Sequence, residues 1–113
     1  MFDLDQLFQK SDLIPVIIQD AETKEVLMLG FTNKEAVELT LKTGTAWFWS
    51  RSRQKLWNKG ETSGNFLHVV EMRTDCDTDT LLYQCRPDGP TCHTGARSCF
   101  FNEIPMNGKD DVP

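Results

Sequence analysis

The chain has 113 residues, of which 39% are apolar and 26% charged, with a formal net charge of −5. This composition is typical of one globular domain and excludes a chain that is disordered throughout. The negative charge argues against general binding to nucleic acid or to an anionic membrane, because both need a positive protein field. With no long apolar run and an acidic N-terminus, we expect a cytoplasmic protein without a membrane span.

The N-terminal third predicts an arm followed by a hairpin. Residues 1–13 carry apolar side chains at near-helical spacing, which indicates a short helix or a docked arm. Two runs rich in β-forming residues, 15–19 and 25–31, are joined by a polar stretch. This pattern predicts two paired strands at the start of the domain.

One helix is expected after the hairpin, over residues 33–43. Thr32 and Glu35 have the spacing of a capping box, in which Thr32 would be the residue that caps the N-terminus. Gly44 stands where a glycine commonly ends a helix. These signals at both ends predict the main helix of the domain.

The remaining sequence alternates strand-like runs with polar segments. Four runs predict strands: 45–50, 66–73, 80–86 and 99–104. The segment 51–65 is polar and is expected to be a long functional loop, and the tail 105–113 is expected to be disordered. We therefore predict an α+β fold for residues 1–113, a single domain with a mostly antiparallel sheet and one main helix.

Three of the four cysteines lie in polar, turn-rich segments, whereas Cys85 lies within a strand-like run and is interpreted as a core residue. Without a secretion signal, metal-binding or catalytic thiolates are favoured over disulfides. Cys76, Cys92 and Cys99 would bind zinc with a fourth position left for water. Their spacing also permits a structural zinc site or free thiols.

Two histidines have roles that the residues alone leave open. His93 directly follows Cys92 and would complete a four-ligand metal site, act as a general acid and base, or only cap a backbone carbonyl. His68 lies within a predicted strand, where packing or a position at the edge of a substrate site is expected.

Asp75, Asp77 and Asp79 occupy alternate positions around Cys76. Carboxylates this close repel one another unless a cation lies between them, and oxygen ligands favour magnesium or calcium. A solvated acidic turn is the alternative. Soft sulfur and hard oxygen ligands alternate here, so two different metals could bind on opposite faces of the segment.

The segment 50–65 holds four of the twelve basic residues together with hydroxyls and glycines. Arginine forks, hydroxyl donors and exposed backbone favour a phosphorylated small molecule, although a solvated basic loop is equally consistent with the residues. Trp47, Phe48 and Trp49 would either stack on a purine or pack in the core, which is the commoner fate of such a stripe.

Four segments together resemble the signature segments of phosphoribosyl-AMP cyclohydrolases. They are Trp47–Trp57, Lys59–Asn65, Asp75–Asp79 and Cys92–Phe100, and the resemblance spans about Pro15 to Phe101. It implies an enzyme, with zinc held by Cys76, Cys92 and Cys99 across the interface of an intertwined homodimer. It also implies magnesium held by Asp75, Asp77 and Asp79.

The activity that the resemblance implies is the third step of histidine biosynthesis. A zinc-activated water molecule would attack C6 of N1-(5-phosphoribosyl)-AMP and open the N1–C6 bond, with His93 as the candidate for proton transfer. The phosphoribosyl group would be held by Arg51, Arg53, Lys55, Lys59, Ser63 and Asn65. A structural zinc module and a nucleotide-binding regulatory domain are the alternatives, and turnover distinguishes all three.

Overall fold

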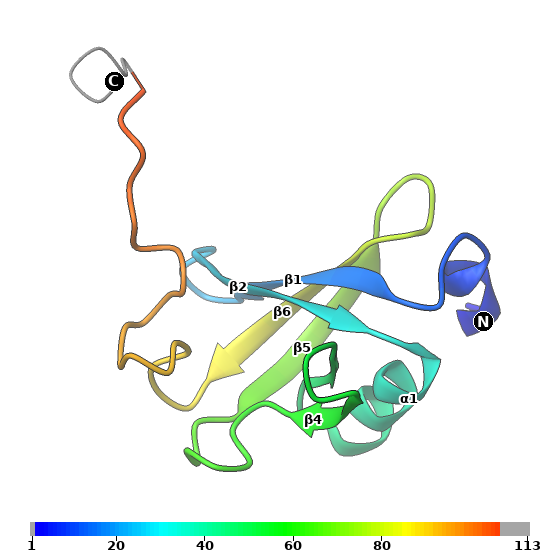
Figure 1. Cartoon of the computed structure of the whole chain (residues 1–113), viewed down its shortest axis with the longest axis horizontal. Helices are drawn as coiled ribbons and strands as arrows, with labels where there is room; N and C mark the ends of the chain where they lie inside the picture. Colours follow the sequence, from blue (N-terminus) through cyan, green and yellow to red (C-terminus); the bar gives the residue numbers. More distant parts are fainter. Residues whose placement is uncertain (1, 107–113) are drawn as a thin grey trace.

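A four-stranded sheet forms the frame of the molecule. The computed structural model describes residues 2–106. The strands are β1 (Ile14–Asp20), β2 (Val26–Thr32), β5 (Leu67–Thr74) and β6 (Leu81–Pro87), in the order β2-β1-β6-β5 (Figure 1). β1 pairs antiparallel with β2 and β5 with β6, whereas the central pair β1–β6 is parallel. The predicted α+β fold and mostly antiparallel sheet are confirmed, with one parallel pair at the centre.

Alternating burial explains why these runs form strands. In β1 the side chains of Ile14, Val16 and Ile18 are buried, and those between them are half-buried. In β6, Tyr83 and Cys85 follow the same period of two, which directs them to the same face of the sheet. The interpretation of Cys85 as a core residue is therefore confirmed. Other elements complete the core with Leu7, Leu27, Val37, Phe48 and Leu67.

Helix α1 (Lys34–Thr43) is the one α-helix within residues 2–106. Asn33 caps it by accepting a hydrogen bond from the backbone N–H of Ala36 at 2.9 Å. Gly44 ends it at φ 79°, donating to the carbonyl of Thr40. The predicted helix is confirmed, but the prediction that Thr32 caps it is wrong, because Thr32 is still paired within β2.

A second sheet of two strands, β3 (Trp47–Ser50) and β4 (Lys55–Asn58), packs against β2. The prediction that 51–65 is entirely loop is wrong, because the chain reverses after Ser50 and pairs with β3. Gly30 permits this packing, since a Cβ atom there would lie 2.6 Å from Cδ1 of Phe48. The small sheet therefore lies close against the frame.

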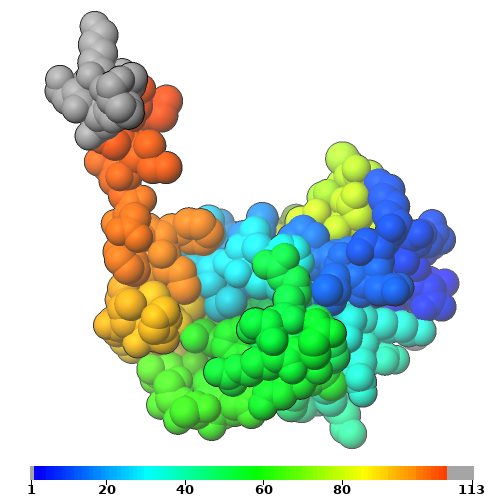
Figure 2. All heavy atoms as spheres, in the orientation of Figure 1, coloured from blue at the N-terminus to red at the C-terminus, as the bar shows by residue number. Residues whose placement is uncertain are grey.

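The N-terminal end of the described chain packs on the core, whereas the C-terminal end does not pair with the sheet. At the N-terminus, a short 3₁₀ helix, η1 (Leu4–Phe8), buries Leu7 against the core, which confirms the predicted short helix. The predicted strand over residues 99–104 is wrong: apart from one hydrogen bond from Cys99 to Leu27, the segment has no β partner within residues 2–106. It extends from one corner of the molecule (Figure 2). The predicted disordered tail lies outside the described residues from position 107 onward.

Candidate active site

The turn between β5 and β6, residues 75–80, is called the acidic turn. The Asp75 carboxylate accepts hydrogen bonds from the backbone N–H groups of Asp79 at 3.0 Å and Thr80 at 3.2 Å. These bonds, with that from Asp79 the largest cause, lower the pKa of Asp75. Asp75 is therefore ionised at neutral pH, and its second oxygen stays available to a cation.

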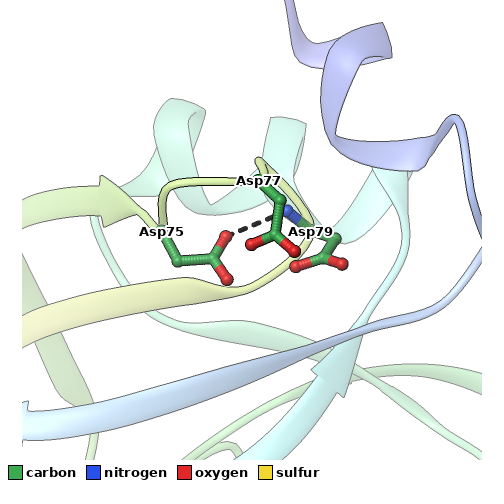
Figure 3. Close-up of side chains that lie close together, drawn as sticks. All are labelled: Asp75, Asp77 and Asp79. Carbon is green, nitrogen blue, oxygen red and sulfur yellow. Dashed lines mark hydrogen bonds between the residues drawn. The ribbon is translucent and has the colours of Figure 1, made fainter.

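The three predicted magnesium ligands lie together in this turn. Within residues 2–106, Asp75, Asp77 and Asp79 are the one group of three or more candidate metal ligands whose ligand atoms lie within 4.8 Å of one another (Figure 3). The Lys10 ammonium lies 3.1 Å from Asp79 and 3.5 Å from Asp77. A positively charged side chain thus already lies against the turn, as the repulsion among its carboxylates would favour.

The second cluster lies in residues 91–99, called the cysteine loop. The backbone N–H of Cys92 donates to the carbonyl of Ala96, and that of Gly95 donates to the carbonyl of Cys92, so the chain reverses sharply. Gly95 has φ 93°, a conformation that favours glycine. Each thiol contributes to the pKa shift of the other, which indicates that Cys92 and Cys99 lie near each other.

The two neighbouring thiols have opposite pKa shifts. The Thr94 hydroxyl lies 3.1 Å from Sγ of Cys92, and hydrogen bonding from Thr94 lowers the pKa of that thiol. Burial, and then the charge of Cys92, raise the pKa of Cys99. The positive charge of Lys59 favours the thiolate form of both residues. The pair is thus suited to hold one proton or one metal ion.

Cys76 does not join this pair within one chain. It is exposed in the acidic turn before β6, whereas Cys92 follows β6 at its far end. The seven residues of β6 alone span roughly 20 Å at about 3.3 Å per residue. Figure 1 shows the acidic turn and the cysteine loop at opposite ends of the sheet. The structure thus brings together two of the three predicted zinc ligands.

A polar cavity of about 590 Å³ opens beside the cysteine loop. Its lining includes two of the four predicted basic residues, Arg53 and Lys59, and it also includes Cys92 and His93. Ser63 and Asn65 complete the predicted residues that line it. A cavity that combines cations, hydroxyls, a thiol and an imidazole has the groups needed to bind a phosphorylated ligand and to transfer a proton.

Two predicted phosphate-binding residues lie elsewhere. The Arg51 guanidinium lies 3.8 Å from the centre of the Phe31 ring, and Lys55 does not line the cavity. His68 pairs with Asp88, its Nε2 lying 2.9 Å from the carboxylate. Contacts of Arg51, Lys55 and His68 with a substrate stay predictions.

Trp57 is the aromatic residue at the cavity that sequence reasoning missed. Phe48 is 1% exposed and belongs to the core, as the commoner fate of an aromatic stripe predicts. Trp57 packs on Phe48 with ring centres 5.5 Å apart, and it also lines the cavity near Lys59. Pairing of Trp57 with Phe48 across β3 and β4 would have identified it, but β4 was not predicted.

An α+β domain with a carboxylate cluster, a thiol pair and a polar cavity has the side chains of a metal-dependent enzyme. Residues 28–101 match the family model of phosphoribosyl-AMP cyclohydrolase. No helix within residues 2–106 is long and apolar enough to cross a membrane.

Curated relatives agree with the family model. The chain is similar to the phosphoribosyl-AMP cyclohydrolase of Archaeoglobus fulgidus, with 61% identity over 97 residues that cover 86% of this chain and 90% of the relative. It is 58% identical to that of Clostridium botulinum over 83% of this chain and 86% of the relative. The chain belongs to the phosphoribosyl-AMP cyclohydrolase family and is an enzyme.

A third relative is about twice as long. The bifunctional histidine biosynthesis protein of Lactococcus lactis is 57% identical over 104 residues, which cover 91% of this chain and 49% of that protein. This chain therefore corresponds to about half of the longer relative.

Proposed function

We propose that this single domain catalyses the third step of histidine biosynthesis in the cytoplasm, opening the N1–C6 bond of N1-(5-phosphoribosyl)-AMP by hydrolysis. The observation that carries the proposal is the cavity that Cys92 and His93 line together with the basic residues Arg53 and Lys59. Family membership supports the same activity. The product is the phosphoribosyl-formimino aminoimidazole carboxamide ribotide.

The donor sets fit the two metals that the family resemblance implies. Cys92 and Cys99 offer neighbouring thiols, and hydrogen bonding already lowers the pKa of one of them. Zinc held by these thiolates would act as a Lewis acid and lower the pKa of a water molecule. The three aspartates of the acidic turn offer oxygen ligands, which suit magnesium, and a bound magnesium ion would supply positive charge near the phosphates of a substrate bound by the partner subunit.

The residues of the chain would carry out the remaining steps. Arg53 and Lys59 bind a phosphate of the substrate through charge-assisted hydrogen bonds. Trp57 packs against the purine ring and limits its orientation. His93 moves a proton from the attacking water to N1, the nitrogen that leaves C6 but stays in the product. Ser63 and Asn65 add hydrogen bonds at the cavity wall.

The zinc site is proposed to be completed by a second subunit. Because Cys76 and Cys92 lie at opposite ends of β6, one chain supplies the thiol pair and its partner supplies Cys76. Exposed apolar residues support an intertwined homodimer: Phe100 is 64% exposed and Ile104 is 85% exposed. Such residues beside the cysteine loop are suited to pack against another copy.

The first test is turnover of phosphoribosyl-AMP by the purified protein, measured by absorbance. Turnover should be lost on chelation of zinc, return when zinc is restored, and be absent in Cys92→Ala. Cys85→Ala is the control, since Cys85 is buried away from the cavity. A folded, zinc-loaded wild-type protein without turnover would contradict the proposed function and favour a structural zinc module or a regulatory domain.

A further inference from the structure

Arg97 connects the cysteine loop to the first hairpin of the sheet. Its guanidinium Nη2 lies 2.6 Å from Oδ2 of Asp20 and 3.1 Å from Oγ1 of Thr23. Its Nε donates to the Glu25 carboxylate. Three acceptors, all at the turn between β1 and β2, therefore hold one side chain of a loop more than 70 positions later in the sequence.

The main anchor of Arg97 is a buried carboxylate. Asp20 is 4% exposed, at the end of the buried face of β1. Its Oδ1 accepts from the backbone N–H groups of Glu22 and Thr23, so that oxygen is fixed by the hairpin turn. Its Oδ2 faces Arg97. A buried carboxylate needs a paired cation, and here that cation is supplied by the cysteine loop.

The backbone around Arg97 holds both cysteines. The carbonyl of Arg97 accepts from the N–H of Thr91, next to Cys92. Directly after Arg97, the Ser98 hydroxyl donates to the carbonyl of Val26 at 2.8 Å. The N–H of Cys99 donates to the carbonyl of Leu27, also at 2.8 Å. The two residues after Arg97 are thus hydrogen-bonded to β2, and the backbone of Arg97 itself is hydrogen-bonded to the start of the loop.

We propose that Arg97, paired with Asp20, is a positioning residue that holds Cys92 and Cys99 at the separation needed by one metal ion. This rests on the proposed zinc site. Neither Arg97 nor Asp20 lines the cavity, so the pair acts through the loop and not on the substrate. Arginine is better suited than lysine to this position, because a lysine has no fork to reach Asp20 and Glu25 together.

The test measures zinc affinity of the metal-free dimer by competition with a chromophoric chelator. Arg97→Gln should weaken zinc binding about tenfold, the usual cost of removing a group that orients metal ligands, and Arg97→Lys should recover part of it. Arg73→Gln is the matched control. Arg73 is a surface arginine that also pairs with a glutamate, Glu71, but lies on β5. The Arg73→Gln protein should bind zinc with the affinity of the wild type.

Cobalt spectra and kinetics separate positioning from general stability. With cobalt in place of zinc, Arg97→Gln should show altered thiolate-to-cobalt absorption and a lower kcat with little change in KM. Glu25→Gln removes only the more exposed of the two carboxylates that pair with Arg97, and it should reduce zinc affinity less than Arg97→Gln does. It replaces Arg97→Gln as the test if that variant does not fold. Wild-type zinc affinity and cobalt spectrum in both variants would overturn the proposal. If the unsubstituted protein binds zinc but does not turn over phosphoribosyl-AMP, the proposed function is contradicted and the positioning role of Arg97 is not.

Discussion

If Cys76 and the thiol pair of one metal site come from different subunits, two inactive variants should complement each other. Cys76→Ala and Cys92→Ala would each be inactive as homodimers, because every site then lacks one ligand. In a heterodimer of the two, one site carries both substitutions and the other carries neither. The heterodimer should therefore have about half of the wild-type activity, since a twofold dimer has two equivalent sites.

The assay uses two affinity tags on co-expressed chains, purification over both tags, and turnover of phosphoribosyl-AMP per dimer. Zinc content should also be about one ion per heterodimer against about two per wild-type dimer. The control pairs Cys92→Ala with Cys99→Ala. Both substitutions then affect the same half of the site, so each site keeps one defect and no activity should return. A purified Cys76→Ala/Cys92→Ala heterodimer without activity or zinc would refute the shared-site reasoning.

Three further predictions follow from individual contacts. Lys10→Gln should tighten magnesium binding about fivefold in a calorimetric titration, because the ammonium against the acidic turn competes with the ion; unchanged affinity would contradict this. Tyr83→Phe should raise the free energy of unfolding in denaturant by about 1 kcal/mol or leave it unchanged, because the buried hydroxyl has no hydrogen-bond partner among residues 2–106; a lower free energy of unfolding would show that the hydroxyl is hydrogen-bonded in the folded protein. In zinc-free protein at neutral pH, mass spectrometry should find Cys92 alkylated before Cys99, since its lowered pKa gives more thiolate. Cys85, whose pKa burial raises to about 12, should react last, and raising the pH should narrow the difference between Cys92 and Cys99; equal rates at neutral pH would contradict the assigned shifts.

Local patterns in the sequence predicted most of the fold. The first hairpin and α1 were predicted because alternation, capping and a terminal glycine are properties of neighbouring residues. β4 was not predicted, because Lys55–Asn58 is a run of only four residues within a polar segment, and its pairing with β3 makes it a strand. The opposite error occurred at residues 99–104, where apolar residues suggested a strand that has no β partner within residues 2–106.

The candidate site was predicted in its residue types and only in part in its arrangement. The three aspartates at alternate positions lie together in a turn, and their binding of magnesium stays a prediction. The separation of Cys76 from Cys92 depends on β6, whose length and direction no local pattern sets. The pairing of Asp20 with Arg97 joins residues 77 positions apart, and nothing near either residue indicates it. Contacts between residues so far apart in the sequence depend on the order of the strands in the sheet.

The parallel pairing of β1 with β6 has a consequence for the order in which the protein folds. The two antiparallel hairpins are local, but Gln19 and Gln84 lie side by side although they are 65 residues apart. Closing a loop of that length costs about 4 kcal/mol in chain entropy. We therefore expect each hairpin to form before the two join, and the acidic turn to exist before the cysteine loop is anchored on Asp20. Pulsed hydrogen exchange during refolding should protect β5 before β1 and β6 pair, and simultaneous protection would contradict this sequence of events. The acidic turn and the thiol pair would then form at different times, with the thiol pair assembled last.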